Sequence, residues 1–103
     1  MSRLPTNRSP LHPGEILLEE FIKPYGLTLT DTAKRLRIER VRLSEIVNGR
    51  RGITPNTALR LERLFGASAA FWLGMQQDFD LWNELHSGTA DDVGKIEPLH
   101  RAA

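Results

Sequence analysis

The sequence predicts an all-α domain of five short helices. Two observations lead to this fold class. Five segments carry apolar residues at three- and four-residue spacing, and each lies between residues that commonly start or stop a helix. No segment alternates apolar and polar residues as a half-buried strand does. We expect an irregular arm over residues 1–12, the helical domain over 13–86 and a flexible tail over 87–103.

The first helix is bounded by two prolines. Pro13 suits the first turn of a helix, and Pro24 ends the helical run. Two apolar pairs four residues apart mark the side that faces the core, namely Leu17 with Phe21 and Leu18 with Ile22.

The second and third helices are short and closely spaced. Thr28 is the predicted N-cap of the second, with Asp31 in the capping-box position, and Leu36 lies in its last turn. After the short joint of Ile38 and Glu39, the apolar patch of the third helix is Leu43, Ile46 and Val47. Asn48-Gly49 ends it. Two short helices joined in this way form a helix-turn-helix.

Caps also define the last two helices. Thr54 caps the fourth helix, Pro55 occupies its first position and Gly66 closes it. Ser68 caps the fifth, which we expect to continue through Leu85.

Composition excludes several classes of protein. The 103 residues include no cysteine, which removes disulfides and thiolate metal sites. We find no apolar run long enough for a membrane span and no secretory signal, and we expect a cytoplasmic location. His12, His86 and His100 are widely spaced, so a metal site is not expected. Without a phosphate loop or a nucleophile motif, we expect neither a cofactor nor an enzyme.

Charge is unevenly distributed along the chain. Between Lys34 and Arg63, nine basic residues and three glutamates give +6, whereas the whole chain carries +1 and the remainder therefore −5. A basic centre within an acidic frame suggests a surface for a polyanion. On charge alone, a well-solvated surface explains the pattern equally well.

The third helix favours nucleic acid over a merely solvated face. With its apolar patch turned inward, Val41, Glu45 and Asn48 point outward, and Arg40 and Arg42 flank them. Arginine reads guanine edges, glutamate the cytosine amino group and valine a thymine methyl. We therefore predict four base-reading residues: Arg40, Val41, Arg42 and Glu45.

Short polar and cationic side chains around this helix suit contacts with DNA phosphates. Asn48, Arg50 and Arg51 lie in a turn bounded by glycines, beside exposed backbone N–H groups. Thr28 and Ser44 complete the predicted phosphate-contacting set. For any single arginine, a surface ion pair worth about 0–1 kcal/mol is the alternative.

Large apolar residues recur along the fifth helix as in a heptad seam. Ordinary core packing explains some of them, and we expect Phe71 and Met75 in the core. A small domain has limited room for two tryptophans, so we predict that the rest form a homodimer interface: Trp72, Phe79, Trp82 and Leu85. A twofold dimer places two third helices about 34 Å apart on a palindromic operator in double-stranded DNA.

Residues 12–82 resemble the HigA/VapI family of antitoxins, a branch of the Xre/Cro-type, lambda-repressor-like helix-turn-helix proteins. The resemblance rests on "HPGEIL" with "EEF", on "RRGITPNTALRL" and on "FGASAAFWLGMQ", in this order. It implies a five-helix, homodimeric DNA binder that represses its own operon. It also implies a protein partner, a small toxin of the HigB type, which is a ribonuclease related to RelE.

The chain departs from the family pattern at three positions. Leu29 stands where glutamine is common, which puts a phosphate contact there in doubt. Arg37 stands where glycine usually ends the second helix, and a left-handed conformation there costs about 1–2 kcal/mol. Glu39 replaces the usual serine or threonine cap of the third helix, although its charge suits a helix N-terminus.

Two functions from different classes follow. The first is an antitoxin that also binds operator DNA as an autorepressor. The second is a protein–protein inhibitor of a small basic ribonuclease, for which the −5 charge outside the basic centre is the motivating feature. If no toxin gene lies beside the gene for this protein, we favour a stand-alone dimeric repressor as its function.

Overall fold

The first helical segment begins at the predicted proline as an α-helix and continues as a π-helix. The computed structural model describes residues 9–100, and in it α1 (Pro13–Ile16) runs directly into a π-helix, η1 (Leu17–Ile22). The wider turn places Leu17 and Ile22, five residues apart, on the same buried side. The predicted core-facing side is confirmed, because Leu18 and Phe21 are partly buried and pack against the core beside Leu17 and Ile22.

Four further helices form where the sequence predicts them. They are α2 (Leu29–Leu36), α3 (Arg40–Val47), α4 (Pro55–Phe65) and α5 (Ala69–Leu85). Thr28, Thr54 and Ser68 cap α2, α4 and α5 through side-chain oxygens that accept backbone N–H groups. Glu39 makes no side-chain cap bond at α3. The described residues form no strand, and the all-α prediction is confirmed.

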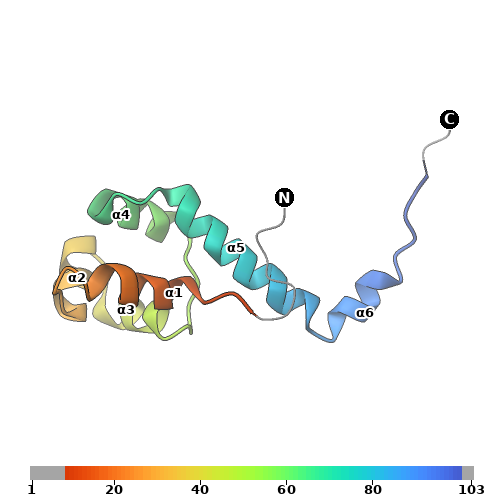
Figure 1. The fold of residues 1–103 in the computed structure, drawn as a ribbon, viewed down its shortest axis with the longest axis horizontal. Coiled ribbons are helices and arrows are strands. Elements are labelled where there is room, and N and C mark those ends of the chain that lie inside the picture. The colour runs from red at the N-terminus through yellow and green to blue at the C-terminus, as the bar shows by residue number, and fades with distance from the viewer. Residues whose placement is uncertain (1–8, 101–103) are drawn as a thin grey trace.

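A sixth helix, α6 (Thr89–Gly94), lies in the segment where we expected no regular structure. Its six residues bury no side chain, so hydrophobic patterning gave no sign of it. Figure 1 shows α1 to α4 gathered at one end of the molecule, while α5 leaves this group and carries α6 and the C-terminal end away from it. Residues 1–8 of the predicted arm lie outside the described residues.

The core lies between α1, η1 and the next three helices and is closed by the start of α5. Its buried apolar side chains are Leu17, Ile22, Ala33, Leu36, Leu43, Ile46, Val47, Ile53, Ala58, Leu61 and Trp72. Nowhere between residues 9 and 100 does a helix have the length and apolar character needed to cross a membrane.

Trp72 corrects the prediction for the fifth helix. Its side chain is 0% exposed in a single chain, and its ring lies 4.9 Å from that of Phe21, between ring centroids. Trp72 therefore belongs to the core and is not available to a dimer interface. Phe71, which we expected in the core, is 41% exposed. Met75 is partly buried against the core, as expected.

A close backbone contact fixes α1 against α3. A Cβ atom added at Gly14 would lie 1.7 Å from the backbone oxygen of Ile46, far inside any allowed contact. His12 prepares this contact, because its Nδ1 accepts a hydrogen bond from the Gly14 N–H at 2.9 Å. The His12 ring also packs edge-on against Phe79 of α5, with 4.8 Å between centroids.

The turn between α2 and α3 contains the predicted strained arginine. Arg37 has φ 60° and ψ 43°, the left-handed conformation that glycine adopts without strain. Arg60 of α4 donates from Nη1 to the backbone oxygens of Leu36 and Arg37, at 2.9 and 3.3 Å. These bonds satisfy carbonyls at the end of α2 and help to hold the turn in place.

We expect Gly14→Ala to destabilise the fold by about 1–3 kcal/mol or more, because the methyl group must push α1 away from α3. Urea denaturation measures the change. Gly88→Ala is the matched control, since a Cβ there meets nothing within 4 Å. Equal stability of Gly14→Ala and the native protein would contradict the close contact.

We also expect stability to fall as the pH drops below about 6.5, the usual histidine pKa. Burial lowers the pKa of His12, although Asp80 and Glu15 oppose the shift. Because the folded state resists protonation, the unfolded state binds more protons in this window, and stability rises with pH. Denaturation of His12→Asn, which keeps a cap acceptor, should show a smaller pH slope. An unchanged slope would rule out His12 as the cause.

Candidate nucleic-acid interface

The orientation of α3 agrees with the sequence prediction. Its inner residues Leu43, Ile46 and Val47 are buried, whereas Arg40 is exposed and Val41 is 66% exposed. An exposed valine at the start of a helix has no packing role in a single chain. The first turn of α3 therefore presents a cation and an apolar side chain to the exterior, the combination expected for reading base edges.

The two arginines that flank Val41 differ in their contacts. Arg40 Nε donates to Thr30 Oγ1 of α2 at 3.1 Å, and the side chain remains at the surface. Arg42 is half-buried, and its Nη2 donates to Thr57 Oγ1 at 2.6 Å at the start of α4. Arg42 therefore ties α3 to α4 in this structure, and only a rotation of its side chain would bring it to a base.

Glu45 and Arg51, predicted to contact a base and a phosphate, are paired with each other. Glu45 Oε1 accepts from Arg51 Nη2 at 2.7 Å and from Nε at 3.0 Å. Both side chains are partly exposed, so the pair contributes about 0–1 kcal/mol to stability. It joins the last turn of α3 to the following loop and holds the guanidinium of Arg51 beside α3.

Asn48 and Arg50 occupy different parts of the turn after α3. Asn48 Nδ2 donates to the backbone oxygen of Ser44 at 2.8 Å, so the side chain closes the end of α3. Gly49 follows with φ +76°, a conformation in which other residues are strained. Arg50 is exposed, and its guanidinium makes no hydrogen bond or ion pair with residues 9–100. Arg50 thus has a free cation for a phosphate.

Thr28 lies at the start of α2 but its hydroxyl is already engaged. It accepts a hydrogen bond from the Asp31 N–H at 3.0 Å, and the Asp31 carboxylate accepts from the Thr28 N–H in return. Hydrogen bonds from Thr28 lower the pKa of Asp31. A phosphate contact of Thr28 therefore requires an additional bond from its hydroxyl or a break in the capping box.

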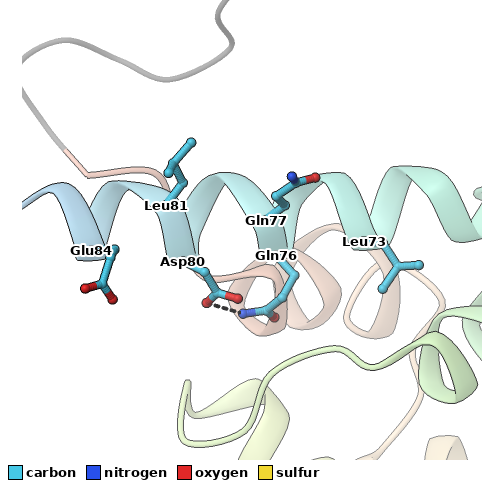
Figure 2. Close-up of a pocket in the computed structure, with 6 residues that line it drawn as sticks. All are labelled: Leu73, Gln76, Gln77, Asp80, Leu81 and Glu84. Atoms are coloured by element: carbon cyan, nitrogen blue, oxygen red, sulfur yellow. Dashed lines mark hydrogen bonds between the residues drawn. The ribbon is translucent and has the colours of Figure 1, made fainter. Parts of the chain in front are cut away.

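Gln76 is a positioning residue that the sequence did not single out. From α5 its Oε1 accepts the Ile53 N–H at 2.7 Å, and its Nε2 donates to Asp80 Oδ1 at 2.9 Å. Figure 2 shows Gln76 and Asp80 joined on the same side of α5. The pair fastens the loop that carries Arg50 and Arg51. Gln76 ends the quoted "FGASAAFWLGMQ", yet neither its charge nor its spacing pointed to this role.

The remaining three residues of the predicted dimer interface lie beyond the core. Phe79 is half-buried against His12, and Trp82 is half-buried and stacked on His86 at 3.8 Å between centroids. Leu85 is 56% exposed. Leu81 is 48% exposed and points away from Gln76 and Asp80 (Figure 2). A hollow of about 470 Å³ runs along this part of α5, between Leu73 and Glu84.

Helix-turn-helix proteins and antitoxins match most of the chain. A helix-turn-helix family model matches residues 18–72. The chain is 54% identical over 71 residues to Virulence-associated protein I of Dichelobacter nodosus, covering 69% of this chain and 66% of that protein. It is 35% identical over 95 residues to antitoxin HigA-1 of Vibrio cholerae, covering 91% of this chain and 88% of that protein.

Solved structures agree with these relatives. Antitoxin GraA in complex with its operator has a TM-score of 0.83 and 32% identity, with 95% of this chain and 99% of that chain covered. Pseudomonas aeruginosa antitoxin HigA with the higBA promoter has a TM-score of 0.82 and 34% identity, with 88% and 99% covered. The chain therefore belongs to the Xre/Cro-type helix-turn-helix family, and its resemblance to the HigA/VapI-type antitoxins is confirmed.

Proposed function

We propose that this protein is a homodimeric, sequence-specific DNA-binding antitoxin that represses its own operon from a palindromic operator. The observation that carries the proposal is the outward face of α3, where Arg40 and Val41 are exposed above a fully buried inner face. The related structures of antitoxin HigA with its promoter and of antitoxin GraA with its operator support it. The proposed function requires no catalysis and acts in the cytoplasm, where the operator is found.

The same proposal includes neutralisation of a small basic HigB/RelE-like ribonuclease by protein–protein binding. Support comes from the relative named antitoxin HigA-1 and from the −5 charge outside the basic segment. Opposite charge speeds association and favours the correct partner. Expression from a two-gene plasmid with the neighbouring gene, followed by purification on a tag of this chain, tests it. A small basic protein that co-purifies and loses ribonuclease activity supports the antitoxin function.

A stand-alone dimeric repressor is the second candidate. Relatives named only as HTH-type transcriptional regulators, such as YbaQ of Escherichia coli at 36% identity over 93 residues, favour it. The two candidates share the DNA site and differ in the partner. If no adjacent gene encodes a small basic protein, the repressor alone remains.

We expect Arg40→Ala and Arg50→Ala to weaken DNA binding in different ways. Arg40→Ala removes a base-edge contact, so affinity for the DNA upstream of the gene should fall by about 1–3 kcal/mol with relaxed specificity. Arg50→Ala removes a phosphate contact, so affinity should fall about equally for upstream and scrambled duplexes, with a shallower salt dependence. Fluorescence anisotropy of labelled duplexes at several salt concentrations measures both. If the native protein binds both duplexes equally, sequence-specific binding is excluded.

We expect the double variant Leu81→Lys, Leu85→Lys to be a folded monomer. Both leucines are about half exposed in the single chain, so lysine costs little there, whereas two added cations disrupt an apolar interface. Sedimentation velocity measures the association state, and circular dichroism verifies the fold. Leu59→Lys, on α4 and 60% exposed, is the control and should remain a dimer. An unchanged dimer in the double variant would move the interface elsewhere.

A further inference from the structure

A groove rich in arginine lies between the end of α2 and the second half of α4. It encloses about 360 Å³ and is lined by Arg35, Leu36, Arg37, Arg60, Arg63 and Leu64, and we call it the arginine groove. A neighbouring hollow of about 280 Å³ shares Arg35 and Leu64 with it and adds Tyr25, Leu27 and Phe65. Together they combine aromatic, aliphatic and arginine side chains, which are characteristic of protein-binding surfaces.

The arginine groove has excess positive charge. Among residues 9–100, the side chains of Arg37 and Arg63 have no hydrogen-bond or ion-pair partner. Arg35 makes no hydrogen bond and interacts only electrostatically with Asp31, and no carboxylate lines the groove. Arg60 is different, because its guanidinium donates to Leu36, Arg37 and Asn56. Two unpaired arginines, with Arg35 beside them, and the apolar walls favour an occupant that carries both carboxylates and apolar side chains.

The C-terminal segment of the chain has this composition. Asp91, Asp92 and Glu97 are exposed, and their carboxylates make no ion pair with residues 9–100. Val93 is 60% exposed, Ile96 71% and Leu99 100%. These three apolar side chains lie within one short segment and are free to pack against a partner. The segment also contains the cation Lys95, but its three carboxylates leave it net acidic, so its charge and apolar residues match the cations and apolar walls of the arginine groove.

The segment cannot reach the groove of its own chain while α5 is intact. Figure 1 shows α5 carrying α6 to the opposite end of the molecule from α2 and α4. In the proposed homodimer, an antiparallel arrangement of the two α5 helices would direct each α6 toward the helical domain of the partner. We propose that residues 91–99 of one copy dock in the arginine groove of a second copy. The inference rests on the proposed homodimer and adds a reciprocal contact to it.

DNA phosphates are the competing occupant, and the surroundings favour the peptide. Leu36 and Leu64 give the groove apolar walls, Phe65 adds an aromatic wall to the neighbouring hollow, and phosphate contacts need none of these. At the start of α4, Thr57 accepts a hydrogen bond from Arg42 of α3. The groove lies further along α4 and includes neither of these residues, so it is separate from the contact between α3 and α4.

A paramagnetic probe tests the docking in the full chain. The sequence has no cysteine, so Gly94→Cys takes a single spin label, at a position where an added Cβ meets nothing within 4 Å. The spin-labelled, isotopically unlabelled copy is mixed with an isotopically labelled native copy. We expect the amide signals of residues 35–37 and 60–64 in the native copy to lose most of their intensity.

Two variants of the spin-labelled copy and a salt titration test whether the docking depends on the carboxylates of the segment. Asp91→Asn with Asp92→Asn should restore the lost signals, whereas Glu20→Gln, an exposed carboxylate on η1, should leave them broadened. About 1 M salt should also restore them, because the Debye length falls to about 3 Å.

Three results overturn the inference. Broadening only when label and isotope share one chain shows contact within a single copy. If no signals are broadened but sedimentation still reports a dimer, the tail contact is rejected and the proposed dimer is retained. If sedimentation reports a monomer, the tail contact and the proposed dimer are both rejected. Weaker operator binding by Arg35→Glu with Arg63→Glu, without broadening in the mixed sample, assigns the groove to DNA phosphates.

Discussion

The close approach of α1 to α3 at Gly14 and Ile46 is the constraint on which the rest of the site depends. No side chain fits between these backbones, so the end of α3 cannot move without displacing α1. His12 extends the constraint to α5, because it caps α1 and its ring packs against Phe79. The turn that carries Arg50 directly follows this fixed end of α3. A recognition helix needs this rigidity, since small displacements weaken directional contacts with bases.

Side-chain hydrogen bonds from other helices also hold α3 and its flanking turns in place. Gln76 fastens the loop after α3 to α5, and Arg60 fastens the end of α2 to α4. Arg42 and Thr57 join α3 to the start of α4. Each contact joins two different helices or a helix and a loop. The proposed DNA-binding surface is therefore anchored at several points, whereas the exposed side chain of Arg50 makes no such contact within residues 9–100.

Local signals predicted much of this structure. Proline, threonine and serine placed the starts of α2, α4 and α5 correctly, and glycine placed the ends of α3 and α4, because capping depends on neighbours in sequence. The apolar spacing of Leu43, Ile46 and Val47 gave the orientation of α3 for the same reason. The π-helix was not predicted, because the apolar spacing was interpreted as that of an α-helix, whereas hydrogen bonds in a π-helix join residues five apart instead of four. Contacts between distant residues were harder to predict. The sequence gives no sign that Arg42 binds Thr57, that Gln76 holds a loop, or that Trp72 fills the core while Phe71 is partly exposed.

The proposed function requires two α3 helices to read one palindromic operator from a twofold dimer. Hydroxyl-radical footprinting of the DNA upstream of the gene tests it most directly. The expected result is a pair of symmetric protected regions whose centres lie about 34 Å, or about one helical turn, apart. Protection of a single unpaired region, or uniform weak protection along the duplex, would contradict the claim.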